Sequence, residues 1–483
     1  MYPRLERRFR LLVCDGKFEL FRNDTVEEFQ LDGEQYEFML RLDGTTELPE
    51  IMKEYDSESR IAITDLLGEL QTLEALEELD QPSRRVFPQA YPSPYLEAVL
   101  WDITSLCNLR CTHCYVSDYF RGAKGSDLPT EEALRVIDEM GEMNVRDVSL
   151  TGGEPFQRKD FRDLIRRIVE NNIRIASIFT NGVDVGNDTV GFFVEEVKLP
   201  RRCRVRISLD GMTPESNSVL RGRTSEAKVV FEKTLGTIRR FVEAGFLVSV
   251  GTSIHRSNVH QLPEMYSFVK DLGIQEWRMA VPKPIGQYKN TENLIGANWD
   301  EVLVAYKRVI DAHLADCEKV DGGVKYPIKV DIEQTFRTEL IEKTLNTFNP
   351  NDIVCFYHKS RCSVKANGDV TPCGYFDHIV TGNVRTAGGL QQAWESTAMQ
   401  QVKQTRIKDI SDCRGCSLLR TCGTGCRAIA SKVNGGMCSK DPYACRTAPL
   451  LEDYIVISLK QRGLHMTMSD GCSEYSVTEN NPL

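Results

Sequence analysis

The chain has 483 residues, of which 41% are hydrophobic and 27% are charged, and its net charge at neutral pH is −10. This composition is ordinary for a folded protein of more than one domain. The negative charge argues against non-specific binding to nucleic acid. No apolar run is long enough to cross a membrane, and only three apolar residues, Leu11, Leu12 and Val13, follow the basic start. We therefore expect a cytoplasmic protein.

The 16 cysteines are unevenly spread along the chain. Three fall between residues 107 and 114, nine fall between 355 and 445, and only Cys14, Cys203, Cys317 and Cys472 stand apart. In a long chain with this expected location, clustered cysteines indicate metal centres more often than disulfides.

Residues 1–80 are predicted to form a small α+β domain of winged-helix type. The expected strands are Phe9 to Cys14, Lys17 to Phe21 around an Asp15-Gly16 turn, and Thr25 to Gln30; the expected helices are Gly33 to Leu42, Thr46 to Tyr55 and Ile61 to Leu79. This order resembles the peptide-recognition domain, similar to the pyrroloquinoline quinone chaperone, that binds leaders of ribosomally made natural products. The resemblance implies that a leader adds as a strand beside the third strand. The alternative is a structural cap.

Residues 81–95 are rich in proline and are predicted to be an extended linker. From residue 96 to about 290, strands and helices alternate, which predicts a parallel sheet covered by helices. The expected strands are Ala98 to Ile103, Asp147 to Leu150, Arg174 to Phe179, Val205 to Leu209, Leu247 to Ile254 and Glu276 to Met279. The expected helices are Glu131 to Met143, Phe161 to Glu170, Thr189 to Val197, Ala227 to Ala244 and Leu262 to Leu272. Six such units predict a partial (β/α)6 barrel of TIM type, with functional residues where the strands end.

Three cysteines, Cys107, Cys111 and Cys114, directly follow the first of these strands, in the sequence Cys-Asn-Leu-Arg-Cys-Thr-His-Cys-Tyr. This spacing can direct three thiolates at one centre, and thiolates select zinc or iron–sulfur clusters. The stretch resembles the CxxxCxxC loop of radical S-adenosylmethionine (SAM) enzymes. The resemblance implies a [4Fe-4S] cluster whose fourth iron binds SAM. A zinc knuckle or a set of buried thiols is the alternative.

Further signals lie at the ends of the next strands. Gly152-Gly153-Glu154-Pro155 resembles the motif that holds the SAM amino group, since glycines allow close approach and a carboxylate accepts from an ammonium group. Asn181 and the Ser208-Leu209-Asp210 stretch follow later strands, and Arg278 to Gly286 resembles the superfamily's RxxxPxxPxG stretch. The residues that the resemblance places at SAM are His113, Tyr115, Gly152, Gly153, Glu154, Asn181, Ser208 and Asp210.

Residues 291–350 are predicted to be a helical bridge, with helices over Asn298 to Asp316 and Asp331 to Thr344. In residues 351–450 the cysteines follow the spacing CX12GX4C and then CX2CX5CX3C, which resembles the SPASM domain with its two auxiliary [4Fe-4S] clusters. The family pattern implies one cluster on Cys355, Cys362, Cys373 and Cys426, and another on Cys413, Cys416, Cys422 and Cys445. Cys438 is the alternative to Cys445, and two zinc sites are the alternative to clusters. Residues 451–483 are expected to form a C-terminal helix and tail.

The resemblances together imply an oxidoreductase that cleaves SAM to a 5′-deoxyadenosyl radical and modifies a ribosomally made precursor peptide, bound through its leader. Thioether cross-links from cysteine are the expected product, with carbon–carbon cross-links or epimerisation as alternatives. A flavodoxin or ferredoxin is the expected electron donor, and neither nucleic acid nor a membrane is expected as a partner. A sulfatase-maturing enzyme that makes formylglycine and a non-catalytic, zinc-stapled peptide-binding scaffold are the other candidate functions. The sequence identifies no catalytic acid or base.

Overall fold

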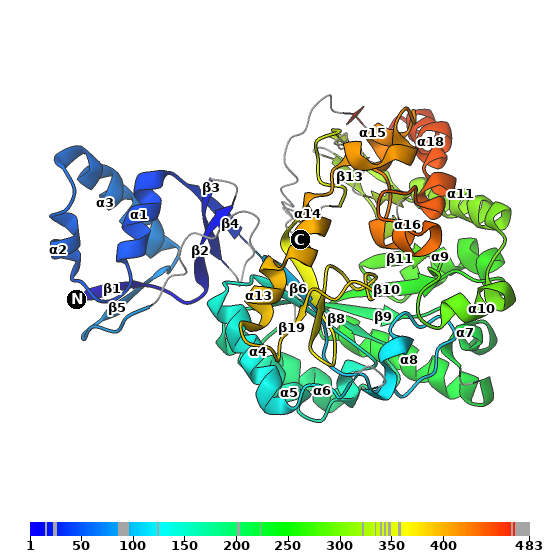
Figure 1. The fold of residues 1–483 in the computed structure, drawn as a ribbon, viewed down its shortest axis with the longest axis horizontal. Coiled ribbons are helices and arrows are strands. Elements are labelled where there is room, and N and C mark those ends of the chain that lie inside the picture. The colour runs from blue at the N-terminus through cyan, green and yellow to red at the C-terminus, as the bar shows by residue number, and fades with distance from the viewer. Residues whose placement is uncertain are drawn as a thin grey trace.

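One 11-stranded sheet organises most of the chain, with the strand order β15-β14-β11-β10-β9-β8-β7-β6-β17-β18-β19 (Figure 1). The computed structural model describes residues 1–468 except 15–16, 23–26, 86–95, 123–124, 200–202, 223, 321–322, 334, 339–340, 342–343, 346–348, 356–358 and 465–466. The eight neighbouring strands from β14 to β17 pair in parallel. They are β6 (Ala98–Asp102), β7 (Asp147–Thr151), β8 (Arg174–Thr180), β9 (Arg204–Ser208), β10 (Leu247–Ser253), β11 (Glu276–Ala280), β14 (Lys329–Ile332) and β17 (Arg361–Val364).

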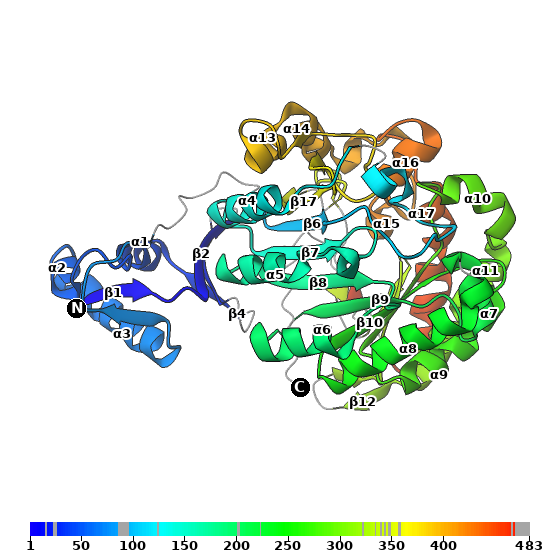
Figure 2. The same ribbon diagram turned by 90° about the horizontal axis from the view of Figure 1, so that it is seen from below.

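Helices that follow the strands cover one face of this sheet (Figure 2). They are α4 (Thr130–Glu142), α5 (Phe161–Glu170), α6 (Asn187–Gly191), α8 (Ala227–Glu243) and α9 (Leu262–Asp271). In α5, for example, Phe161, Leu164, Ile165 and Ile168 form the buried stripe, because residues three and four apart share a helix face. The predicted partial barrel is confirmed. The short helix α7 (Pro214–Arg221) was not predicted.

The N-terminal residues form a unit with its own hydrophobic core. Its elements are β1 (Tyr2–Leu5), β2 (Phe9–Cys14), β3 (Lys17–Arg22), β4 (Glu27–Leu31), α1 (Gly33–Arg41), α2 (Leu48–Met52), α3 (Ser57–Thr72) and β5 (Leu76–Leu79). The strand order β2-β3-β4 leaves β4 at an edge of this three-stranded sheet. The predicted helix to Leu79 is wrong at its end: α3 stops at Thr72, Glu74 has a φ of 55°, and β5 then pairs with β1.

The N-terminal unit contacts the barrel at the edge where the parallel strands begin. The Arg10 guanidinium, from β2, donates hydrogen bonds to the carbonyls of Val145 and Asn171, which precede β7 and β8. The Asn144 side chain donates to the carbonyl of Leu11. The unit therefore lies opposite the edge at which the barrel strands end, as the blue elements in Figure 1 show.

The C-terminal region continues the barrel sheet, because β17 pairs in parallel with β6. Its other elements include α10 (Tyr288–Ile295), α11 (Trp299–Ala315), β15 (Phe336–Arg337), β18 (Asp369–Thr371), β19 (Gly382–Asn383), α13 (Gly389–Glu395), α14 (Thr397–Gln404), α16 (Arg427–Asn434), α17 (Pro442–Thr447) and α18 (Val456–Gln461). The helix predicted from Asp331 is wrong, because Val330 and Ile332 belong to β14 and are fully buried.

Several predicted features lie outside the described residues: the Asp15-Gly16 turn, residues 86–95 of the linker, and the tail from 469 with Cys472. In the described part of the chain, no helix has the length and apolar character needed to span a bilayer.

Candidate functional site

The loop with the first three cysteines leaves the carboxyl end of β6. Cys107, Cys111 and Cys114 are all partly buried free thiols. Burial and, to a smaller extent, the neighbouring Cys111 raise the pKa of Cys107 to about 11. Burial, Cys111 and Cys107 likewise raise the pKa of Cys114. The loop thus brings three thiols into electrostatic range of one another.

Four glycines from other loops hold this loop through contacts that a side chain would block. A Cβ on Gly152 would lie 2.4 Å from the carbonyl oxygen of Thr104, and one on Gly153 would lie 2.1 Å from that of Leu106. A Cβ on Gly222 would lie 2.0 Å from the carbonyl oxygen of Arg110, and one on Gly286 would lie 2.2 Å from that of Cys114. The Gly153 N–H donates to Thr104 and the Glu154 N–H donates to Leu106. The sequence indicated that Gly152 and Gly153 approach a ligand, whereas the structure shows that they approach the cysteine loop itself.

Glu154 links the loops after β7 and β8. It is 1% exposed, and its carboxylate accepts hydrogen bonds from the Thr180 hydroxyl and the Asn181 N–H, each at 2.8 Å. The Asn181 side chain donates in turn to the Asn108 side chain in the cysteine loop, at 2.7 Å. Burial raises the pKa of Glu154 to about 7. The predicted residues at these two strand ends therefore form one network beside the thiols.

Asp210 forms a buried ion pair that the sequence did not indicate. Its Oδ2 atom pairs with Arg221 at 2.6 Å, and its Oδ1 atom accepts a hydrogen bond from the Ser253 N–H at 2.8 Å. Arg221 also points toward Cys111, with Nη1 4.0 Å from Sγ. Asp210 is fully buried. It fixes Arg221, and Arg221 in turn faces the cysteine loop, so Asp210 acts on the loop through Arg221. Ser208, at the end of β9, is partly buried.

His113 lies against the same ion pair, with Nε2 4.0 Å from Oδ2 of Asp210. Burial lowers the pKa of His113 to about 4, so the ring is neutral at physiological pH and can pack against an uncharged aromatic group.

Two tyrosines connect the first loop with the C-terminal cysteines. The rings of Tyr115 and Tyr375 pack edge to face with centroids 6.0 Å apart. Glu333 raises the pKa of Tyr375, as do burial and Cys426. Burial and Asp102 raise the pKa of Tyr115 well above its usual value, and Tyr375 and Cys114 act in the same direction. The aromatic pair thus lies between the two sets of thiols.

Charged residues at the ends of β11 and β14 complete this region. Arg278 pairs with Asp331 at 3.0 Å, and Lys283 pairs with Glu333 at 3.1 Å. The Glu333 side chain is 25% exposed, although its Oε2 atom is buried. Sequence reasoning missed Asp331 and Glu333 because it assigned them to a helix. The one available signal was Lys283, which departs from the RxxxPxxPxG pattern.

The remaining predicted ligands fall into two groups. In the first, burial raises the pKa of Cys426, and Cys373 and Cys355 raise it further. The second group comprises Cys413, Cys416, Cys422 and Cys445. Burial, Cys445 and Cys413 together raise the pKa of Cys422 to about 11. Cys416 in turn raises the pKa of both Cys413 and Cys445.

Cys362 lies apart from both groups. It sits on β17 opposite Val99 of β6, it is fully buried in the main core, and the charged neighbour that acts on its thiol is Lys403. None of Cys355, Cys373 and Cys426 is among the main influences on the pKa of Cys362, and we propose that Cys362 is not a ligand of the first auxiliary cluster. Cys438 is exposed, and it is not among the main influences on Cys413 or Cys422, whereas Cys445 is.

Comparison with known families matches two parts of the chain. A model described as "Radical SAM superfamily" matches residues 101–269, and one described as "Iron-sulfur cluster-binding domain" (SPASM) matches residues 355–417. The chain has a radical SAM domain followed by a SPASM domain. It is therefore a radical SAM enzyme, with an iron–sulfur cluster that binds SAM and a domain for auxiliary clusters.

Relatives by sequence support this result. An AdoMet-dependent heme synthase of Methanosarcina barkeri is 25% identical over 71% of the chain and 95% of its own length. The mycofactocin maturase MftC of Mycobacterium tuberculosis is 26% identical over 68% of the chain and 77% of its own length.

Solved structures share the fold. Streptococcus suis SuiB bound to the precursor peptide SuiA has a TM-score of 0.63 and 15% identity, covering 92% of the chain and 99% of SuiB. Native anSMEcpe with bound AdoMet and Kp18Cys peptide has a TM-score of 0.57 and 18% identity, covering 77% of the chain and 99% of anSMEcpe.

The three thiols after β6 are of the ligand type that iron–sulfur clusters use. Within the described ranges, no three His, Cys, Asp or Glu side chains are assembled as they would be around one metal ion. A four-iron cluster separates its thiolates more widely than one ion does, and thiolates are its usual ligands. We assign the first cluster to Cys107, Cys111 and Cys114 as a proposal, because only this loop offers three thiols at the end of β6.

Proposed function

We propose that this radical SAM enzyme modifies a ribosomally made precursor peptide that it binds through its leader. When bound, the first cluster supplies the electron that cleaves SAM to a 5′-deoxyadenosyl radical, which removes a hydrogen atom from the substrate. The observation that carries this proposal is the loop of three thiols, fixed by four glycines at the same strand ends as the Glu154 network.

The chain's own residues have separate tasks around SAM. Glu154 accepts the SAM ammonium group, Ser208 bonds a ribose hydroxyl, and the neutral ring of His113 packs near the adenine. Asn181 fixes both Glu154 and the cysteine loop. Asp210 acts indirectly, by holding Arg221.

The peptide substrate is supported by the N-terminal unit. β4 is an edge strand of its sheet, and a peptide can add to such an edge through main-chain hydrogen bonds. The match to SuiB covers 92% of the chain, so it includes most of this unit. MftC is also named as a maturase.

Thioether formation is the finer part of the proposal. Among the described residues, the first auxiliary group offers the thiols of Cys355, Cys373 and Cys426, while Cys362 faces the core. A cluster held by three protein thiolates leaves one position for a cysteine sulfur of the substrate. A flavodoxin or ferredoxin in the cytoplasm would supply the electrons, and a reducing compartment suits the chain's free thiols.

A second candidate substrate is a heme precursor. It is favoured by the heme synthase relative, of which the chain covers 95%. In that case the edge of β4 would have no role in substrate binding.

The deciding experiment compares full-length enzyme with two proline variants, Phe29→Pro and Gln30→Pro. In an antiparallel strand, successive N–H groups point to opposite sides, so one of the two changes removes a donor from the open edge and the other disturbs the β3 pairing. The edge variant should lose affinity for the precursor but keep peptide-independent SAM cleavage.

The measurements are leader binding by fluorescence anisotropy, 5′-deoxyadenosine by chromatography, and product mass. If removal of residues 1–80 leaves a stable enzyme with unchanged precursor affinity and modification, the unit is a cap and the leader proposal is wrong. Turnover of a heme precursor, with no change in peptide mass, would favour the second candidate.

A further inference from the structure

The SPASM part of the chain is basic, although the protein as a whole is acidic. Residues 396–450 contain nine Lys or Arg, three Asp and no Glu, whereas the whole chain has a net charge of −10. Such a charge asymmetry within one molecule creates a local positive field that attracts acidic partners.

The thiols nearest to solvent lie in this same basic segment. Among the described cysteines, only Cys416, Cys438 and Cys445 are exposed. Two of them, Cys416 and Cys445, belong to the second auxiliary group, whereas Cys373 and Cys426 of the first group are more enclosed. An electron can therefore enter or leave the protein over a short path at the second group.

Exposed cations surround these thiols. Lys440 is exposed and lies five residues before Cys445 in the chain. Arg414 lies between Cys413 and Cys416 and donates to the carbonyl of Lys408, and both basic side chains are exposed.

The nearby acids do not cancel this charge. Asp441 is buried, where it caps α17 by accepting hydrogen bonds from Tyr443 and Ala444. The exposed Asp412 accepts a hydrogen bond from the N–H of Lys440. The exposed cations Lys408, Arg414, Lys440 and Arg446 thus outnumber the exposed carboxylates Asp409 and Asp412 around the second group.

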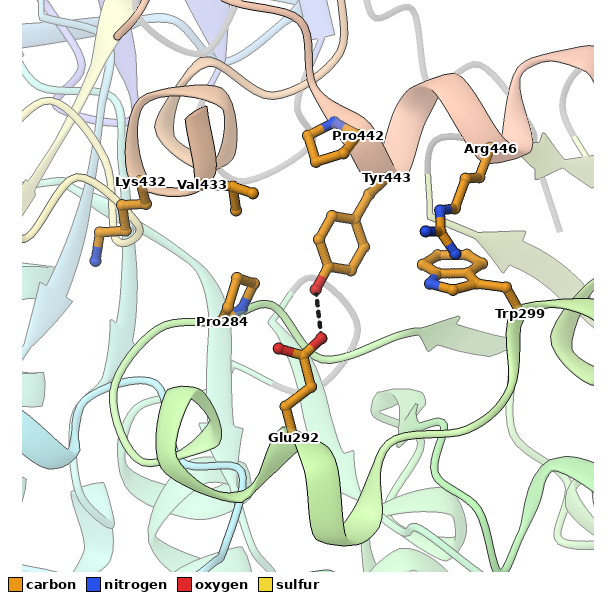
Figure 3. Close-up of a pocket in the computed structure, with 8 residues that line it drawn as sticks. All are labelled: Pro284, Glu292, Trp299, Lys432, Val433, Pro442, Tyr443 and Arg446. Carbon is orange, nitrogen blue, oxygen red and sulfur yellow. Dashed lines mark hydrogen bonds between the residues drawn. The ribbon is translucent and has the colours of Figure 1, made fainter. Parts of the chain in front are cut away.

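A pocket of about 330 Å³ adjoins this face, because α17 carries Cys445 and two of the pocket's lining residues, Tyr443 and Arg446. Figure 3 shows Tyr443 directed at Glu292, and their hydrogen bond is 3.1 Å long. The Arg446 guanidinium stacks on the Trp299 ring, 5.2 Å from its centroid. Trp, Tyr and Arg in a pocket are the residue types that most often anchor protein partners.

We propose that this basic face of the SPASM domain, with the Trp299–Tyr443 pocket as its anchor, docks an acidic one-electron carrier protein of the flavodoxin or ferredoxin type. The proposal rests on the iron–sulfur function given above. On each encounter the reduced carrier loses one electron, and the iron–sulfur group held by Cys413, Cys416, Cys422 and Cys445 gains it.

An acidic segment of the precursor peptide would meet the same positive field, but it would gain nothing from exposed thiols. The observations therefore favour the carrier, because charge, exposed thiols and aromatic anchor coincide on one face.

The test uses anaerobically reconstituted full-length enzyme and a purified recombinant flavodoxin. In the double variant Lys408→Glu/Lys440→Glu, the flavodoxin dissociation constant at low salt should rise about tenfold or more, since charges at a protein interface mainly govern encounter and specificity. The matched control, Lys228→Glu/Arg239→Glu, makes the same charge change on the exposed face of α8 and should leave this constant unchanged.

Iron content and SAM cleavage driven by dithionite should match the wild type in both variants. With the unmodified enzyme, flavodoxin binding should also weaken between 50 and 300 mM NaCl, because salt screens exposed charges. A dissociation constant that is insensitive to salt, or equal in the two variants, would overturn the proposal. So would a loss of precursor affinity instead of flavodoxin affinity. Failure of dithionite-driven cleavage in the wild type would instead contradict the proposed function.

Discussion

Replacing Gly222 by alanine should displace the cysteine loop without touching a thiol. Gly222 ends α7 with a φ of 70°, and an added Cβ would lie 2.0 Å from the carbonyl oxygen of Arg110. Since Cβ contacts shorter than 3.0 Å are essentially never observed, the loop or the helix must move by about 1 Å. The left-handed conformation adds a cost of about 1–2 kcal/mol for alanine.

Gly245 provides the matched control for this substitution. It follows α8 with a φ of 82°, and an added Cβ would meet nothing within 4 Å. Gly245→Ala should therefore lose about 1–2 kcal/mol of stability from backbone strain alone, with normal cluster content and activity.

For Gly222→Ala we expect a similar or larger loss of stability and, in addition, a drop of about 100-fold in 5′-deoxyadenosine formation, because a shift of about 1 Å in a reacting group has that effect. The assays are thermal unfolding, iron content and anaerobic SAM cleavage with dithionite. Equal behaviour of the two alanine variants in all three assays would refute the view that close glycine contacts position the cysteine loop.

Three further predictions concern buried groups. Cys373→Ser should lose auxiliary iron, whereas Cys362→Ser should keep it and only destabilise the core; iron loss from Cys362→Ser would restore that residue to the ligand set. Because burial raises the pKa of Glu154 to about 7 and the SAM ammonium prefers its ionised form, SAM affinity should fall about tenfold from pH 8 to pH 6. Titration calorimetry checks this, and the trend should vanish in Glu154→Gln. Although burial opposes its charge, Arg174 and Arg146 lower the pKa of Asp147 to about 2. Asp147 thus contributes about 2 kcal/mol that is present above pH 4 and lost as the pH falls toward 2; acid unfolding of Asp147→Asn should lack this slope.

The parallel strands could be predicted because short apolar runs recur between amphipathic helices, and β6 to β11 lie within a residue or two of their expected positions. The end of α3 could not be predicted, because Leu73 and Leu76 continue the helical stripe while Glu74 turns the chain into β5. The helix predicted from Asp331 was wrong because Val330 and Ile332 are the only apolar positions of a short strand. The polar residues around them hide its period-2 pattern.

At the site, local motifs indicated which residues matter but not which groups they contact. The glycines of the Gly152-Gly153 pair depend on backbone 48 and 47 residues away in the sequence, at Thr104 and Leu106. The Asp210–Arg221 pair depends on α7, which has no motif of its own. The position of Cys362 was set by pairing of β17 with β6, which cysteine spacing does not encode.

Under the proposed leader binding, the position of the N-terminal unit sets a minimum spacing between the recognised segment of a precursor and the residue that reacts. A leader segment held at β4 lies near the edge where the barrel strands begin, while the thiols lie where they end. The seven residues of β8 span roughly 23 Å at about 3.3 Å per residue. Even a fully extended precursor therefore needs about seven residues between its recognised segment and the residue that reacts, and more if it bends around the sheet. The enzyme would act as a molecular ruler: shortening this spacer should abolish modification while the peptide still binds.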